Sequence, residues 1–194
     1  MRDVFTKYEM DITPFYDQLI GQSMDVYFST PETMRQVEKY SYYVAGSVGL
    51  MLLPIIASKA TIDLTDQAIS LGIAMQITNI LRDVGEDYQT KYKIYLPSQE
   101  MEEAAYTEDK LAHGVINDGF IYIWEKMAHR AENLYAKFLD DVHHFDQDSK
   151  VPVVLSAKVY RGILTSVRNN HYDCFGMRNA VSSEQMEKIY SAIE

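Results

Sequence analysis

The sequence has one cysteine, five prolines and no long uninterrupted apolar segment among its 194 residues. The lone Cys174 cannot form a disulfide within the chain, which favours a reducing, cytoplasmic setting. The longest apolar stretch, 44–57, is shorter than the roughly 20 residues that a membrane helix needs, and Pro54 interrupts it. The first residues lack the apolar core of a secretory signal. We therefore expect a soluble protein with no transmembrane segment.

Positive charge is also scarce. The 28 acidic residues outnumber the 18 basic ones and give a formal net charge of −10. This charge disfavours binding to nucleic acid, so an anionic ligand would need local cations or a metal ion. The hydrophobic share of 47% and the charged share of 24% are typical of a globular protein. Because no linker rich in Gly, Ser or Pro divides the chain, we predict a single domain over 1–194.

Helical spacing of apolar residues is much more frequent in this chain than strict two-residue alternation, which predicts an all-α fold. Two helices are expected to start near Pro14 and Pro31, each of which follows a threonine. Further predicted helices cover 65–87, 118–145, 151–170 and 182–193. We expect Thr65, and Ser182 or Ser183, to cap the helices that they begin.

A polar stripe interrupts the apolar pattern of the predicted 65–87 helix, which a loop over 85–97 would end. The stripe contains Gln76, Asn79, Asp83 and Asp87. These spacings of three, four and four residues place all four side chains on one helical face that points inward. Oxygen ligands such as Asn79, Asp83 and Asp87 suit Mg²⁺, which shares its other positions with water and substrate phosphates. The alternative is a solvated face whose aspartates pair with Arg82 or Lys91.

Segment 76–87, Gln-Ile-Thr-Asn-Ile-Leu-Arg-Asp-Val-Gly-Glu-Asp, closely resembles the second aspartate-rich signature of the squalene and phytoene synthase family. Upstream, segment 40–49, Tyr-Ser-Tyr-Tyr-Val-Ala-Gly-Ser-Val-Gly, is similar to the family's other signature. Downstream, segment 93–97, Lys-Ile-Tyr-Leu-Pro, is similar to its Arg-Ile-Tyr-Leu-Pro loop. Segments 160–164 and 172–178 resemble its last helices. The likeness covers essentially the whole chain.

This resemblance implies an all-α isoprenoid synthase helical bundle. Such an enzyme joins two prenyl diphosphates head to head through a cyclopropyl intermediate, presqualene diphosphate, with Mg²⁺ on the diphosphates. The chain looks most similar to the bacterial dehydrosqualene synthases of carotenoid biosynthesis, which use farnesyl diphosphate. Phytoene synthases, which use geranylgeranyl diphosphate, are the alternative, and the motifs do not separate the two substrates.

The resemblance also implies roles for residues at the diphosphate end of the substrate. The ligands of Mg²⁺ would be Asn79 and two aspartates that are essential for catalysis, Asp83 and Asp87. The side chains that contact the substrate would be Gln76, Arg82, Tyr160 and Arg178. The last three would donate hydrogen bonds to diphosphate oxygens. For Arg82, the alternative is an ion pair at the surface.

The prenyl tail would enter a tunnel that the resemblance places along segment 40–49. Its lining residues would be Tyr40, Val44, Ala45 and Gly49. Small residues there allow either an alkyl chain or a second helix to approach the backbone closely. Lys93 either closes over a diphosphate or is a solvated charge. The five histidines show no metal-binding spacing, and we interpret them as surface or structural residues.

One feature of the family pattern is missing. The family carries two aspartate-rich motifs on facing helices, whereas 1–60 contains no Asp-x-x-x-Asp pair. The resemblance therefore predicts a synthase truncated by about the N-terminal third of that pattern. The uncovered apolar face would favour a homo-oligomer or a domain swap, and product release would involve peripheral membrane contact. The alternative function is an inactive chain that binds only metal, diphosphate or a partner subunit.

Overall fold

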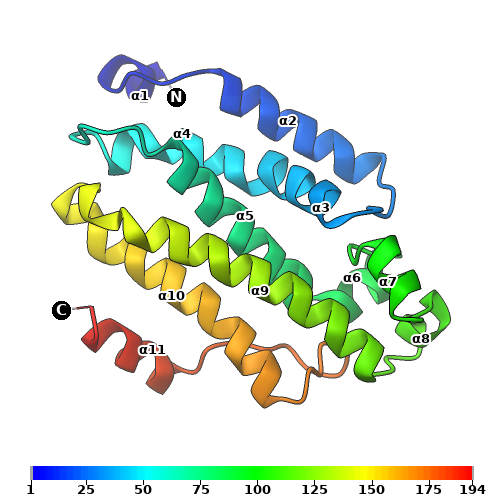
Figure 1. The fold of residues 1–194 in the computed structure, drawn as a ribbon. Coiled ribbons are helices and arrows are strands. Elements are labelled where there is room, and N and C mark those ends of the chain that lie inside the picture. Colours follow the sequence, from blue (N-terminus) through cyan, green and yellow to red (C-terminus); the bar gives the residue numbers. More distant parts are fainter. Residues whose placement is uncertain (1, 194) are drawn as a thin grey trace.

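The computed structural model describes residues 2–193, and every regular element in that range is helical (Figure 1). The first half contains α1 (Arg2–Lys7), α2 (Thr13–Val26), α3 (Met34–Ser41), the π-helical turn η1 (Tyr42–Gly46), α4 (Ser47–Ile56), α5 (Thr65–Arg82) and α6 (Val84–Lys91). The second half contains α7 (Ser98–Glu103), α8 (Glu108–Ala112), α9 (Asp118–Asp140), the 3₁₀ turn η2 (Val142–His144), α10 (Gln147–Asn169) and α11 (Ser183–Ser191). The predicted all-α class is confirmed.

Helix α5 lies at the centre of the bundle, in contact with α3, η1, α4, α9 and α10 (Figure 1). Its apolar positions recur at helical spacing, so that Ile77 and Leu81 are completely buried. They share one core with Trp124 and Tyr135 of α9. The Tyr135 hydroxyl lies 2.9 Å from that of Thr78, which satisfies both buried groups. This packing fixes the helix that carries the polar stripe.

The two prolines expected at helix starts behave differently. Helix α2 has Pro14 in its first turn, as predicted, although it begins at Thr13 itself and its N-cap is Ile12, so that Thr13 does not cap it. Pro31, however, precedes its helix, and α3 begins only at Met34. The reason is the better cap at Thr33, which has an extended backbone and whose hydroxyl accepts a hydrogen bond from the Gln36 N–H at 3.3 Å.

Of the two other predicted caps, one is observed and one is not. Ser182 caps α11 and forms a capping box with Gln185, as expected. Thr65 does not cap α5, because it is already the first helical residue and the N-cap position is Leu64, whose side chain makes no capping hydrogen bond. The Asp63 carboxylate instead accepts a hydrogen bond from the Thr65 N–H at 2.9 Å.

Glycines allow the 34–56 helical run to lie against α5. A Cβ on Gly49 would be 2.6 Å from the carbonyl oxygen of Ala68, and one on Gly72 would be 2.5 Å from that of Ala45. These distances are too short for any other residue, so the small residues of segment 40–49 serve close helix packing. The π-helical turn η1 lies at this crossing, and such turns are frequent at functional sites.

Apolar side chains also remain exposed in the region that the structure describes. On α2 and next to it they include Tyr16, Leu19, Ile20, Val26 and Tyr27, and on α4 they include Leu52. Apolar side chains of α2 and α4 are thus uncovered in this structure, whereas the truncation, an oligomer and a domain swap stay predictions. No helix within 2–193 has both the length and the apolar character required to cross a bilayer.

A charged network joins α9 to α10. Arg168 donates to Glu125 at 2.8 Å and to Glu132 at 2.6 Å, and its guanidinium lies 5.4 Å from the centre of the Trp124 ring. The Tyr172 hydroxyl also donates to Glu125 at 2.8 Å. The contact with Arg168 lowers the pKa of Glu125 below its usual value. Folding therefore favours the ionised carboxylate of Glu125.

The substitution Glu125→Gln should destabilise the protein by about 1–2 kcal/mol at pH 7 because it weakens these charge-assisted bonds. A carboxyl whose pKa is lower in the folded state stabilises the protein above its unfolded pKa, about 4.3, and loses that contribution as the pH falls through the folded value. The difference between wild type and variant in urea unfolding should therefore shrink below about pH 4.3. The matched control is Glu184→Gln, at an exposed ion pair on α11, which should change little at either pH. A difference independent of pH would contradict this prediction.

Candidate functional site

The sequence predicts one continuous helix for the polar stripe, and this prediction is wrong. The helix breaks at Asp83. Helix α5 ends at Arg82 and α6 starts at Val84, with Asp83 between them at φ −106° and ψ 18°. The predicted loop over 85–97 is correspondingly shorter, since α6 continues to Lys91. Asp87 therefore belongs to a second, reoriented helix.

Side chains and backbone groups far along the chain cause this break. In a continuous helix the Gly85 N–H would donate to the Leu81 carbonyl. Here the Leu81 carbonyl accepts from the indole N–H of Trp124 at 3.1 Å, and the Gly85 N–H donates to the Cys174 carbonyl at 3.1 Å. A Cβ at Gly85 would lie 2.7 Å from the Cα of Phe175, so glycine is required for this contact. The Leu81 carbonyl and the Gly85 N–H thus both keep a hydrogen-bond partner although they no longer bond to each other.

A polar cavity of about 300 Å³ lies beside the break. Its lining includes Asp25, Tyr40, Gln76, Asn79, Arg82, Asp83, Asp87, Lys91, Lys93 and Tyr95. The four residues of the predicted stripe are thus gathered around one space despite the break. Arg82, expected either there or in an ion pair, does both: it lines the cavity and is paired with Asp83.

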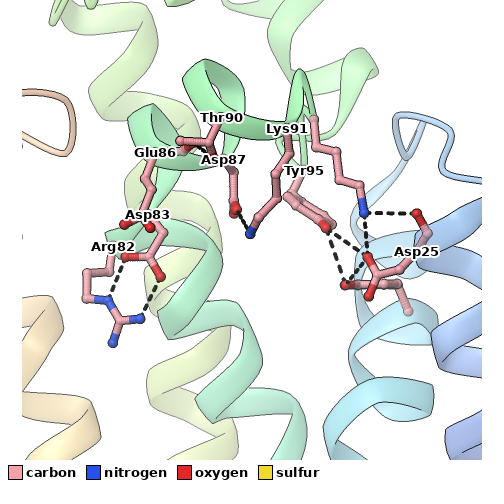
Figure 2. Close-up of polar contacts among 10 residues, drawn as sticks. Asp25, Arg82, Asp83, Glu86, Asp87, Thr90, Lys91 and Tyr95 are labelled. Carbon is pink, nitrogen blue, oxygen red and sulfur yellow. Dashed lines mark hydrogen bonds and ion pairs between the residues drawn. The ribbon is translucent and has the colours of Figure 1, made fainter.

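Each carboxylate that lines the cavity is paired with a cation (Figure 2). The pairs are Asp83 with Arg82 at 2.7 and 2.5 Å, Asp87 with Lys91 at 2.8 Å, and Asp25 with Lys93 at 2.7 Å. Burial raises the pKa of Asp87, and the contact with Lys91 partly opposes that shift. The hydrogen bonds to Asp83 raise the pKa of Arg82. The cavity is therefore lined by charged groups of both signs.

Asn79 supplies the observation that bears on a metal ion. Its side-chain oxygen is buried and has no hydrogen-bond partner among the described residues. Within residues 2–193, no three His, Cys, Asp or Glu side chains are grouped closely enough to hold a metal ion by themselves. An ion here would need the Asn79 oxygen, Asp83, Asp87, and further oxygens from water or phosphate. This donor set fits Mg²⁺, which typically keeps such outside ligands.

Asp25, at the end of α2, completes the opposite wall of the cavity and was not expected there. One of its carboxylate oxygens accepts from Lys93 at 2.7 Å, from Tyr40 at 3.1 Å and from Tyr95 at 3.2 Å. Burial raises the pKa of Tyr40 to about 12, so its hydroxyl stays a donor. Tyr40, predicted in the tail tunnel, therefore lies on the polar wall. No spacing signal in the sequence points to Asp25.

A second, apolar cavity of about 450 Å³ adjoins the polar one, because Gln76 and Asn79 line both. Its other lining residues include Val44, Ala45, Gly49, Leu71, Met75, Phe138, Phe145 and Tyr160. Three of the four predicted tunnel residues are thus found in it. Tyr160, predicted to donate to a diphosphate, also lies in this apolar cavity.

Arg178 is the predicted substrate contact that the structure does not bring to the site. It lies exposed in the segment between α10 and α11 and lines neither cavity. Its neighbour Asn179 is buried and donates to the Asp173 carbonyl at 2.7 Å, which fixes the turn in this position. The likeness of segment 172–178 to the family's last helix therefore does not bring Arg178 to the lining of the polar cavity.

The end of α6 contains a strained residue. Tyr92 follows the helix in the left-handed conformation, at φ 53° and ψ 35°, where glycine is the usual residue. The substitution Tyr92→Gly should raise the free energy of unfolding by about 1 kcal/mol by relieving that strain. Chemical denaturation measures the change. Tyr92→Ala keeps a Cβ and should give no such gain; equal gains from both variants would contradict this explanation.

The family profile described as squalene/phytoene synthase matches residues 1–185 of this sequence. The chain belongs to this family. The 15-cis-phytoene synthase of Synechococcus elongatus is 36% identical over 187 residues, which cover 91% of this chain and 60% of that protein. The 4,4'-diapophytoene synthase of Staphylococcus haemolyticus is 36% identical over 189 residues, which cover 97% and 66%. The membership expected from the motifs is confirmed.

Solved structures agree with this assignment. The crystal structure of a dehydrosqualene synthase in complex with ligand matches with a TM-score of 0.91 and 38% identity, over 99% of this chain and 67% of that one. YisP from Bacillus subtilis matches with a TM-score of 0.88 and 29% identity, over 98% and 75%. The predicted isoprenoid synthase fold is confirmed. The chain spans 60% and 66% of the lengths of the two synthases named above.

Proposed function

We propose that this protein takes part in the head-to-head joining of two prenyl diphosphates. The observation that carries the proposal is the junction of the two cavities at Gln76 and Asn79. A prenyl diphosphate has a charged head and a long apolar tail, and this pair of cavities offers a separate environment for each. Family membership supports the same reaction class.

In the proposed reaction, the C1–O bond of one substrate breaks and diphosphate leaves. The resulting allylic cation adds to the double bond nearest the diphosphate of the second substrate, and loss of a proton closes a cyclopropane ring. Asn79, Asp83 and Asp87 would hold Mg²⁺, which acts as a Lewis acid on the departing group. Arg82 would donate to diphosphate oxygens, and the apolar cavity would keep water from the cation.

We propose farnesyl diphosphate as the substrate, on the basis of the likeness to the dehydrosqualene and 4,4'-diapophytoene synthases. Geranylgeranyl diphosphate is the second candidate because the 15-cis-phytoene synthase is 36% identical. Loss of the second diphosphate, opening of the cyclopropane ring and loss of one further proton would leave a water-insoluble hydrocarbon. We also propose that the enzyme is cytoplasmic and releases this product at a membrane surface.

Incubation with each diphosphate and Mg²⁺, followed by mass spectrometry, tests this function. Two preparations are needed: the chain alone, and the chain joined to the part of the Staphylococcus haemolyticus synthase that it does not span. We expect a C30 hydrocarbon or its cyclopropyl diphosphate from farnesyl diphosphate. A C40 product would instead select geranylgeranyl diphosphate. Binding of diphosphate without product in either preparation would favour an inactive binding protein.

A further inference from the structure

The ion pairs around the polar cavity present a difficulty for any ligand. Asp83 and Asp87, the proposed ligands of a metal ion, are already paired with Arg82 and Lys91. A metal ion that binds alone must displace these cations, which then have no partner. A diphosphate that binds alone must draw the cations away and leave two carboxylates uncompensated. Both outcomes are costly because the Asp83 and Asp87 side chains are only 20% and 13% exposed.

Lys91 is the cation best placed to change partners. Its side chain is 56% exposed, and among the described residues its ammonium pairs with one carboxylate, that of Asp87, one helical turn away. Its flexible four-carbon stem lets the ammonium move without any motion of the backbone. Because it lines the same cavity as Arg82 and Asp83, a short movement keeps it beside a bound anion.

Lys93 differs from Lys91 although it lines the same cavity. Its side chain is 17% exposed, and its ammonium donates both to the Asp25 carboxylate at 2.7 Å and to the Asp25 backbone carbonyl at 3.0 Å. The ammonium also lies 5.1 Å from the centre of the Phe28 ring. Three contacts therefore hold Lys93 in place, and Asp25 is not among the proposed metal ligands.

We propose that Lys91 exchanges partners when metal and diphosphate bind together. In the unliganded protein it neutralises Asp87; in the liganded protein Asp87 turns to the metal ion and Lys91 donates to a diphosphate oxygen. Charge stays balanced in both states, because each displaced cation gains an anionic partner as each carboxylate gains a cationic one. The inference rests on the proposed function and adds Lys91 to the residues that recognise the diphosphate.

This exchange predicts that the metal ion and the diphosphate strengthen one another's binding. Isothermal titration calorimetry with Mg²⁺ alone, inorganic pyrophosphate alone and preformed magnesium pyrophosphate measures that coupling. The substitution Lys91→Met should strengthen binding of Mg²⁺ alone several-fold, because Asp87 is no longer neutralised. The same variant should weaken binding of magnesium pyrophosphate by about tenfold. A merely structural lysine would not shift the two affinities in opposite directions.

Matched variants complete the experiment. Lys188→Met removes an equivalent pair with Glu184, one turn apart on α11 and away from the cavity, and should change neither affinity. Lys91→Arg keeps the charge and should retain the coupling. If Lys91→Met leaves magnesium pyrophosphate binding unchanged, or weakens both ligands equally, the exchange is refuted while the proposed function stands. Failure of the wild type to bind magnesium pyrophosphate at all would overturn both proposals.

Discussion

The substitution Gly72→Ala is expected to lower the free energy of unfolding by about 2 kcal/mol, although alanine is the better helix former. An added Cβ would lie 2.5 Å from the carbonyl oxygen of Ala45 and 2.7 Å from the Cα of Gly46. Both are backbone atoms of η1, so no side-chain rotation relieves the clash. Helix α5 must instead move away from η1, and its contacts in the core weaken.

Urea denaturation of Gly72→Ala and Gly162→Ala provides a matched comparison. Gly162 also lies within a long helix, α10, but a Cβ there would meet side-chain atoms and no backbone: Ile189 at 3.9 Å and, more closely, the end of the Val181 side chain at 2.9 Å. That side chain can rotate, so helix propensity should dominate and Gly162→Ala should be neutral or stabilising by up to about 1 kcal/mol. Effects of the same sign and size at both glycines would show that the helix crossing does not require glycine.

Much of this architecture could be predicted because local periodicity records it. The buried face of α9 repeats every three or four residues, and the spacing of Gln76, Asn79, Asp83 and Asp87 is likewise local. The four stripe side chains line one cavity even though the helix breaks at Asp83. Helix α6 starts directly after the break, at Val84, so Asp87 stays one helical turn beyond Asp83.

The remaining features depend on contacts between distant segments. The break at Asp83 requires the Trp124 indole and the Cys174 carbonyl, and neither leaves a local signal near Gly85. Asp25 reaches the site only because the loop after α6 packs on the end of α2, where Lys93 contacts it. Arg178 shows the converse case. It matches a family position in the sequence, but its side chain is exposed and lines neither cavity.

The substitution Asp83→Asn should reduce product formation by about a thousandfold in whichever preparation turns over prenyl diphosphate. Asparagine keeps the size of the side chain but removes the negative charge that the proposed metal site and Arg82 both use. The barrier to diphosphate departure should then rise by about 4 kcal/mol, the scale of metal-assisted charge stabilisation. Initial rates with farnesyl diphosphate and saturating Mg²⁺ measure the loss.

Glu86→Gln is the matched control for the Asp83 experiment, because it removes a carboxylate from the first turn of α6, three residues after Asp83. Glu86 is exposed and does not line the polar cavity, so its variant should retain the wild-type rate. If both variants lost activity equally, the general negative charge of α6 would be responsible, and not a carboxylate at a defined position. If Asp83→Asn kept the wild-type rate, the leaving diphosphate would be stabilised without this residue, and the proposed metal site would be wrong.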